Sequence, residues 1–204
     1  MLLFMARHGE TDWNRLGKTQ GTQNTSLTDL GRYQANQLGN KLKNKPISAI
    51  YSSDLDRARE TAQIVGKQVG LEPITCELIR EVCFGNWQGL SIEEIENKYP
   101  GELSKWRNEL SFYPQGGESL SSVHSRIKTF LNILKTNHPS SDETILIISH
   151  AATIKVSILE ILGIPPNFLT KLKASHAGLS LLKMEEGDNA ILYMNDTCHL
   201  DMET

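Results

Sequence analysis

The chain has 204 residues, 39% of them hydrophobic and 22% charged, which is enough for one domain with its own buried core. Its 21 Lys and Arg residues against 24 Asp and Glu residues give a net charge of −3, so a general nucleic-acid-binding protein is not expected. The three cysteines are widely spaced and fit neither a disulfide framework nor a zinc site. No apolar run approaches the roughly 20 residues of a membrane helix. We therefore expect a cytoplasmic protein that does not bind a membrane.

The first part of the chain alternates between expected strands and helices. Residues 2–6 form a short apolar run that predicts a buried strand, and residues 47–51 predict a second strand. A helix is expected after Thr28, which has the side chain of an N-cap residue, and another helix over residues 53–70. Residues 74–78 predict a third strand. This alternation implies an α/β domain built in layers.

The middle of the chain, residues 83–117, is rich in Gly and Pro and contains two short helical patterns. We interpret it as a cap-like excursion of a single domain that spans residues 1–204. Regular elements then resume, as a helix at 118–136, a strand at 144–148, a helix from 150 to 162, and strands at 179–184 and 190–194.

Two histidines lie where a predicted strand ends, which is where α/β sheets place their ligand sites. His8 stands between Arg7 and Gly9, and His150 begins the helix that follows the strand at 144–148. A helix N-terminus and an arginine both favour an anion. Arg57 lies in the first turns of another helix that follows a strand, and Glu81 precedes a turn rich in glycine.

Each of these residues has a plainer explanation when it is taken alone. Arg7 and His8 fit a surface loop, Arg57 fits the solvated face of a helix, and His150 fits a histidine that only stabilises the fold. The four segments together are much more specific, because a nucleophile, cations and an acid then occur at the positions where one cleft is expected.

In this combination the sequence resembles the histidine phosphatase superfamily, also described as the phosphoglycerate mutase-like group. The resemblance covers essentially the whole chain in order, and it implies a three-layer α/β/α sandwich with a mostly parallel central sheet. The segments that carry it are Arg7-His8-Gly9-Glu10-Thr11-Asp12-Trp13-Asn14, Ser26-Leu27-Thr28-Asp29-Leu30-Gly31, Tyr51-Ser52-Ser53-Asp54-Leu55-Asp56-Arg57-Ala58, the segment around Glu81, Gly116-Gly117-Glu118-Ser119 and Ser149-His150.

The resemblance implies a role for each matching residue. His8 is expected to be the nucleophile that becomes a phosphohistidine, and His150 is expected to help bind the phosphoryl group. Arg7 and Arg57 correspond to the two arginines that clamp this group. Glu81 corresponds to the carboxylic acid that protonates the leaving oxygen. The physical chemistry agrees, because a neutral imidazole can attack a phosphate ester only inside a cationic pocket.

Further contacts follow from the same resemblance. Asn14 and the backbone N–H of Ala151 are expected to bind the phosphoryl group, although the family usually has Gly at the position of Ala151. The remaining candidates for the pocket are Gln20, Gly21, Phe84, His176 and His199. The scheme needs no metal and no other cofactor.

The substrate is expected to be a small phosphorylated metabolite, and a phosphatase is favoured over a mutase. Glycolytic mutases carry Arg-His-Tyr-Gly after the matching glutamate, whereas Glu81 is followed by Val82-Cys83-Phe84-Gly85. The run Phe84-Gly85-Asn86-Trp87 resembles α-ribazole phosphatases of cobalamin assembly and broad-specificity phosphatases. Phosphoserine, a sugar phosphate and mutase activity stay open, as does a module that binds a phosphorylated ligand without catalysis. A homodimer is common among relatives.

Overall fold

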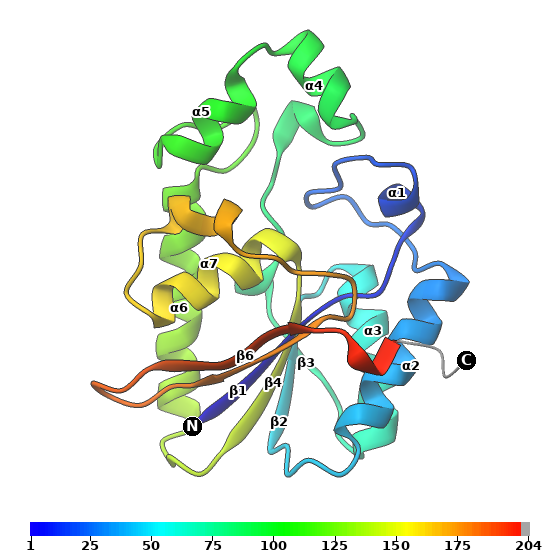
Figure 1. Cartoon of the computed structure of the whole chain (residues 1–204), viewed down its shortest axis with the longest axis vertical. Coiled ribbons are helices and arrows are strands. Elements are labelled where there is room, and N and C mark those ends of the chain that lie inside the picture. The colour runs from blue at the N-terminus through cyan, green and yellow to red at the C-terminus, as the bar shows by residue number, and fades with distance from the viewer. Residues whose placement is uncertain (201–204) are drawn as a thin grey trace.

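The computed structural model describes residues 1–200 and contains a six-stranded sheet (Figure 1). Its order is β3-β2-β4-β1-β5-β6, and the strands are β1 (Leu2–Arg7), β2 (Ala49–Ser52), β3 (Ile74–Thr75), β4 (Thr144–Ser149), β5 (Leu179–Lys183) and β6 (Ala190–Asp196). The first four strands are parallel to one another, whereas β5 is antiparallel to β1 and to β6. The expected mostly parallel sheet is confirmed.

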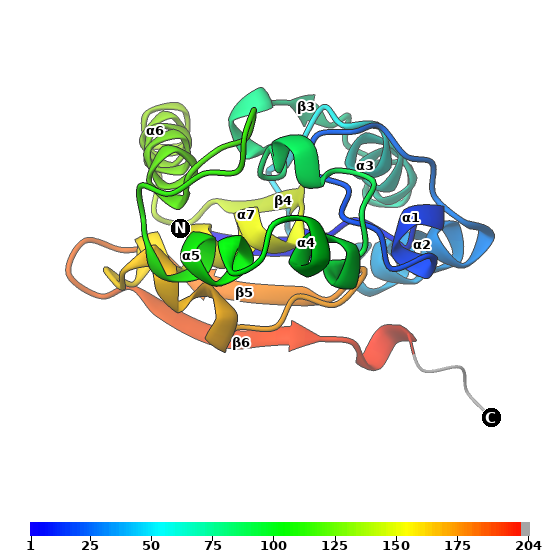
Figure 2. The same cartoon turned by 90° about the horizontal axis from the view of Figure 1, so that it is seen from above.

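Helices cover both faces of the sheet, so the expected three layers are present (Figure 2). Helices α2 (Asp29–Leu42) and α3 (Asp56–Val69) pack on one face, and α6 (Leu120–Asn137) and α7 (Ala151–Ile161) pack on the other. Strand side chains alternate between the two cores, as the period of two in a strand requires. In β1, Leu3 and Met5 face α6 and α7, whereas Phe4 and Ala6 face α2 and α3.

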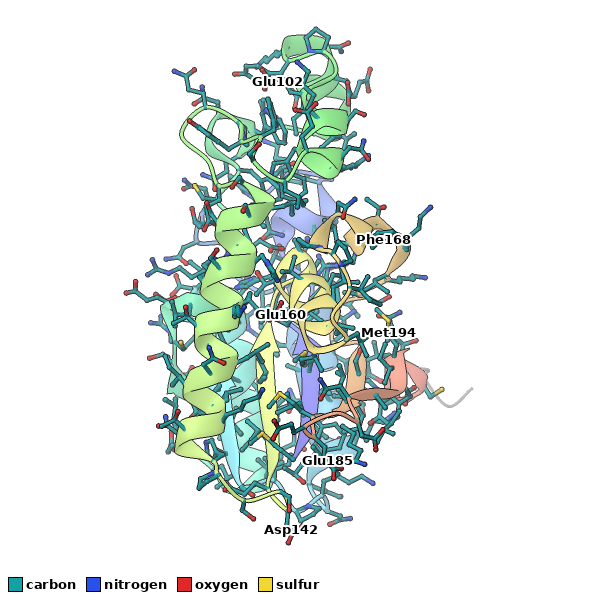
Figure 3. The ribbon with its side chains drawn as sticks, turned by 90° about the vertical axis from the view of Figure 1, so that its left-hand side faces the viewer. Glu102, Asp142, Glu160, Phe168, Glu185 and Met194 are labelled. Atoms are coloured by element: carbon teal, nitrogen blue, oxygen red, sulfur yellow. The ribbon has the colours of Figure 1, made fainter. Side chains whose placement is uncertain are left out.

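The segment between the sheet and α6 extends above the carboxyl ends of the parallel strands (Figure 1). It contains α4 (Ile92–Lys98) and α5 (Glu102–Asn108), which we call the cap helices. Figure 3 places Glu102 of α5 and Asp142, in the loop before β4, at opposite ends of the molecule. The loop after α1 (Asp12–Arg15) joins the base of the cap, since the N–H of Thr19 donates to the carbonyl of Leu90 at 2.8 Å.

Local signals in the sequence explain several helix ends. Thr28 is the N-cap of α2 and accepts a hydrogen bond from the N–H of Gly31. Gly70 ends α3 in the left-handed conformation with φ of 77°, as is common for a C-terminal glycine. Ser119 caps α6, so this helix begins at Leu120 rather than at residue 118. These caps confirm the elements and shift their boundaries by a few residues.

The third strand is shorter than the sequence predicts. Only Ile74 and Thr75 pair with β2, which itself ends at Ser52, so the following residues have no strand to pair with. They form the 3₁₀ turn η1 (Glu77–Ile79) instead. The remaining short turns are η2 (Gly85–Trp87), η3 (Pro166–Lys171) and η4 (Cys198–Leu200). Within residues 1–200, no helix is both long enough and apolar enough to cross a bilayer.

The loop after β1 lies unusually close to the start of α2. A Cβ atom on Gly31 would come within 2.1 Å of the carbonyl oxygen of Glu10, and one on Gly9 within 2.3 Å of the carbonyl oxygen of Gly31. Both contacts involve backbone, which cannot move away cheaply. The two glycines therefore hold the residues that follow His8 against α2.

We expect Gly31→Ala to lower the free energy of unfolding by about 2 kcal/mol, because overpacking must displace backbone. Gly39→Ala in the same helix is the matched control, since the three atoms nearest to its new methyl group all belong to the flexible side chain of Gln68. The higher helix propensity of Ala should leave that variant within about 1 kcal/mol of the wild type. Urea unfolding measures both, and equal stabilities for the two variants would contradict the close approach.

Candidate active site

The pairing of β1 with β4 brings His8 and His150 together. Arg7 and Ser149 are register partners at the carboxyl ends of these two parallel strands, so the next residue of each strand is a histidine. The N–H of His8 also donates to the carbonyl of Ser149 at 3.0 Å. The ring centroids of His8 and His150 lie 5.2 Å apart, and both side chains are buried.

Hydrogen bonds at both ring nitrogens define the tautomer of His8. Nδ1 lies 2.7 Å from the carbonyl oxygen of Gly9, which can only accept, so Nδ1 carries the proton. Nε2 in turn accepts a hydrogen bond from Nε of Arg57 at 3.2 Å. The lone pair of Nε2 therefore points toward the guanidinium group of Arg57. A neutral imidazole of this tautomer has the electron pair that a nucleophile needs.

The guanidinium of Arg57 is buried, and backbone carbonyls accept its hydrogen bonds. Besides the bond to His8, NH1 donates to the carbonyl of Gln23 at 2.8 Å and NH2 to that of Gly21 at 2.7 Å. Arg7 donates from NH1 to the carbonyl of Ala174 at 3.0 Å. Within residues 1–200, neither Nε of Arg7 nor either ring nitrogen of His150 has a hydrogen-bond partner. These buried polar atoms are suited to bind a ligand with many acceptor oxygens.

Burial and positive charge act together on these groups. Burial, followed by the charges of Arg57 and Arg7, holds the pKa of His8 well below its usual value. The same causes in the same order lower the pKa of His150. Burial lowers the pKa of both Arg7 and Arg57 to about 10, with the carboxylate of Glu81 opposing the shift. At neutral pH the site thus combines two charged arginines with two neutral histidines.

Glu81 is buried beside the N-terminus of α7. Its Oε1 accepts from the N–H of Val82 at 3.0 Å and from the N–H of Thr153 at 3.3 Å, and its Oε2 accepts from the N–H of Ala152 at 3.3 Å. The backbone around it is held in turn by Ser149, which donates to the carbonyl of Ile79 at 2.7 Å. The carboxyl group is thereby fixed in the lining of the cavity that His8 also lines.

The remaining predicted phosphate contacts also line this site. Asn14 uses Oδ1 as an acceptor for the N–H and hydroxyl of Thr11, at 3.1 and 2.9 Å, in a capping box of α1. This leaves the amide nitrogen of Asn14 as its donor toward the cavity. Ala151 is the first residue of α7, where backbone N–H groups have no acceptor within the helix.

A cavity of about 620 Å³ connects these groups with the cap. Of the further predicted pocket residues, Gln20, Gly21 and Phe84 line it. Phe84 stacks on Trp87 with ring centroids 6.2 Å apart and meets the edge of Trp106 at 5.2 Å. The cavity therefore has a charged end at His8 and an aromatic wall toward the cap.

Two histidines that the sequence proposed for the pocket are absent from the cavity lining. The His176 ring centroid is 6.2 Å from that of His8, and His199 is 3.1 Å from the carbonyl oxygen of Ala177 through Nε2. Neither is among the residues that line the cavity. His199 belongs to η4, which packs against α2. The structure thus does not support the placement of His199 in the pocket.

Three cations in the cavity were missed by the sequence analysis, namely Lys18, Arg107 and Lys155. Lys155 had a usable signal, because it lies four residues after Ala151 and hence on the same face of α7. Arg107 had none, since only the folding of the cap brings α5 over the sheet. Residues 1–200 contain no group of three or more His, Cys, Asp or Glu side chains arranged to hold a metal ion.

The chain matches the model of the histidine phosphatase superfamily (branch 1) over residues 3–197. It therefore belongs to this superfamily, and it is a phosphatase of the phosphoric monoester hydrolase class. The expected family and the expected enzyme class are therefore confirmed, as the fold was above.

Similar proteins differ in their named substrates. The chain is 35% identical to phosphoserine phosphatase 1 of Hydrogenobacter thermophilus, covering 97% of this chain and 93% of that protein. A structure of mycobacterial glucosyl-3-phosphoglycerate phosphatase with VO3 has a TM-score of 0.88 and 30% identity, over 96% of this chain and 99% of that chain. The α-ribazole phosphatase from Shigella flexneri has a TM-score of 0.86 and 25% identity, over 96% of each chain.

The lowered histidine pKa values predict how stability depends on pH. Burial, and then the charge of Arg7, lowers the pKa of His176 to about 3, and burial is also the main cause that lowers the pKa of His8 and of His150. In the unfolded chain, His8, His150 and His176 each bind a proton with a pKa near 6.5, whereas in the folded chain they stay neutral at this pH. The contribution of these three histidines to the free energy of unfolding is therefore fully present above about pH 6.5, and it is lost progressively as the pH falls below that value.

The variant His176→Gln has one group fewer that takes up a proton on unfolding. The slope of its free energy of unfolding against pH should therefore be smaller by about 1.4 kcal/mol per pH unit between pH 5.5 and 4. Urea unfolding at a series of pH values measures the difference. His124→Gln on the half-buried face of α6 serves as a reference, since His124 lies outside the site and pairs with Glu160. An unchanged slope in His176→Gln would show that His176 is protonated in the folded protein.

Proposed function

We propose that the chain is a metal-independent phosphomonoesterase that hydrolyses a small phosphorylated metabolite through a phosphohistidine at His8. The observation that carries this proposal is the hydrogen-bonded tautomer of His8, with Nδ1–H bonded to Gly9 and the Nε2 lone pair at the guanidinium of Arg57. A site that only binds a phosphorylated ligand needs cations, but it needs neither a prepared nucleophile nor a buried carboxyl group.

In the first step, Nε2 of His8 attacks phosphorus, and the bond from phosphorus to the ester oxygen breaks. Arg7, Arg57, the ring of His150 and the N–H of Ala151 stabilise the negative charge on the phosphoryl oxygens. The leaving oxygen takes a proton from Glu81, which enters this step as the neutral carboxylic acid and leaves it as a carboxylate, and which lines the same cavity as His8.

In the second step, water attacks the phosphohistidine, and Glu81 accepts the proton that this water loses. The bond between phosphorus and Nε2 breaks, and inorganic phosphate leaves a neutral His8. Two lower barriers replace one high barrier, which is the general advantage of covalent catalysis. A mutase would have to exclude this water and return the phosphoryl group to the substrate.

The aromatic wall supports α-ribazole 5′-phosphate as one candidate substrate, since Phe84 and Trp106 line the cavity and aromatic side chains pack well against a flat base. Such a substrate would place the protein in cobalamin biosynthesis. Phosphoserine and sugar phosphates are the other candidates. A cytoplasmic location agrees with Cys76 and Cys83, two thiols that form no disulfide in the structure.

The first test is turnover of p-nitrophenyl phosphate in the presence of EDTA, together with trapping of an acid-labile phosphoprotein. His8→Ala should abolish the phosphoprotein and lower kcat at least about 1,000-fold, because no other group supplies the nucleophile. His124→Ala, in the same fold but outside the cavity, should keep both signals. If His8→Ala retains turnover, or if EDTA removes it, the proposed mechanism is wrong.

The second test concerns Glu81 as the general acid. Glu81→Gln cannot donate the proton, so turnover of alkyl phosphates, whose leaving groups are poor, should fall by about 100-fold or more. Turnover of p-nitrophenyl phosphate should fall far less, because nitrophenolate leaves without a proton. Steady-state kinetics on both substrates give the comparison. Equal losses would assign Glu81 a structural role.

A further inference from the structure

The carboxyl group of Glu81 takes the place of a capping side chain at the start of α7. His150 is the N-cap residue of this helix, but its side chain makes no capping hydrogen bond. The carboxyl group instead accepts from the second and third N–H groups of the helix, those of Ala152 and Thr153, at 3.3 Å each. These are the N–H groups that an N-cap side chain would bind, so the helix end is satisfied while the ring of His150 stays available to a ligand.

The two oxygens of this carboxyl group have different surroundings. Oε1 of Glu81 lies 3.0 Å from the N–H nitrogen of Val82, and it lies 3.3 Å from both the N–H nitrogen and the hydroxyl of Thr153. Within residues 1–200, Oε2 accepts only the hydrogen bond from Ala152. A carboxyl oxygen has two lone pairs, so three donors leave Oε1 no room for a proton of its own. In the neutral acid, the proton therefore belongs on Oε2.

The hydroxyl of Thr153 is the only side-chain group among these donors. Thr153 is 1% exposed, and its hydroxyl donates to the carbonyl of Arg80, the residue before Glu81, at 2.6 Å. It thus fixes the backbone next to the acid while Oε1 also lies within its reach. A hydroxyl has one proton and can rotate, so it can turn this proton toward Oε1 when Glu81 becomes a carboxylate.

We propose that Thr153 is a positioning residue for the general acid, which keeps Oε1 of Glu81 as an acceptor and reserves Oε2 as the oxygen that carries the proton. This inference rests on the proposed function, in which Glu81 protonates the leaving group. In that step the ester oxygen keeps the electron pair of its broken bond to phosphorus and takes the proton from Oε2. The negative charge left on Glu81 is then shared with the donors around Oε1, the hydroxyl of Thr153 included.

The test compares two phosphate esters whose leaving groups differ in their need for a proton. Thr153→Val keeps the shape and the N–H of the residue and removes only the hydroxyl. Its kcat/KM for glycerol 3-phosphate should fall about tenfold, the usual effect of one hydrogen bond to a charged group, whereas its kcat/KM for p-nitrophenyl phosphate should fall less than about twofold. Thr153→Ser, which has the hydroxyl, should regain most of the wild-type value. A purely structural role would lower both substrates alike.

Ser157→Ala is the matched control. The hydroxyl of Ser157 is also buried in α7, and it donates to the carbonyl of Thr153 at 2.8 Å. This variant should keep the wild-type ratio of the two substrates. Thr153→Ala removes the hydroxyl without a new methyl group against the carbonyl of Arg80, so it repeats the test if the valine variant does not fold. Equal losses on both substrates, or no recovery in Thr153→Ser, would overturn the proposal.

A double variant shows whether the hydroxyl acts through the carboxyl group. Glu81→Gln combined with Thr153→Val should hydrolyse glycerol 3-phosphate within about twofold of Glu81→Gln alone, because the acid that Thr153 positions is already missing. A further tenfold loss in the double variant would place the effect of Thr153 elsewhere and would overturn the proposal.

The same measurements separate this inference from the proposed function. If Glu81→Gln loses selectively on glycerol 3-phosphate and Thr153→Val does not, only the role of Thr153 is wrong. If His8→Ala retains turnover while Glu81→Gln still loses selectively, the phosphohistidine is wrong and the substrate ratio of Thr153→Val still decides its role. If Glu81→Gln loses equally on both esters, or if the wild type hydrolyses neither, the general acid fails and the role of Thr153 fails with it.

Discussion

The parallel pairing of β1 with β4 is the constraint on which the site depends. Because Arg7 and Ser149 are register partners, the chains leave the sheet side by side and place His8 and His150 next to each other. A shift of one residue would turn the alternating side chains of β1 to the opposite faces of the sheet. The same shift would exchange the two hydrophobic cores, so the packing that stabilises the sheet also determines the distance between the two histidines.

The second feature that organises the molecule is buried positive charge. Arg57 is buried against carbonyl groups of the loop that contains Gly21 and Gln23, and its Nε reaches His8. These contacts satisfy the guanidinium without a carboxylate, so its charge stays available to a ligand. Burial of cations in this way costs stability, and such costs are found where a site is prepared for a charged ligand. The depressed pKa values of the histidines have the same origin.

The segment around Glu81 is attached to β4, α6 and α7 by hydrogen bonds. The chain leaves the sheet after the short strand β3, and hydrogen bonds from Ser149 and Thr153 to carbonyls at Ile79 and Arg80 bring it back to α7. Arg126 of α6 also donates to the carbonyls of Leu78 and Glu81, at 2.7 and 3.3 Å. These hydrogen bonds fix an irregular segment that has no strand partner. This rigidity places a carboxyl group beside the phosphoryl site without a regular element.

Much of the fold could be predicted from the sequence alone, because its signals are local. The apolar runs of β1 and β4, the cap at Thr28 and the glycine at residue 70 each act within a few residues. Boundaries were less certain where a neighbouring strand decides them, as at β3, which ends with its partner β2. The strand order was not accessible in this way, since it depends on contacts between distant segments.

For the site, the sequence by itself determined which residue types are present and that His8 and His150 follow strands. The resemblance to a family then assigned roles to Arg7, Arg57 and Glu81. Only the tertiary structure decided the tautomer of His8, the burial of Arg57 and the absence of His199 from the cavity lining. It also decided that Arg107 of the cap and Lys155 of α7 line one cavity. The physical reason is that desolvation and charge interactions depend on distances between segments that are remote in the chain, and these distances exist only after the layers have packed.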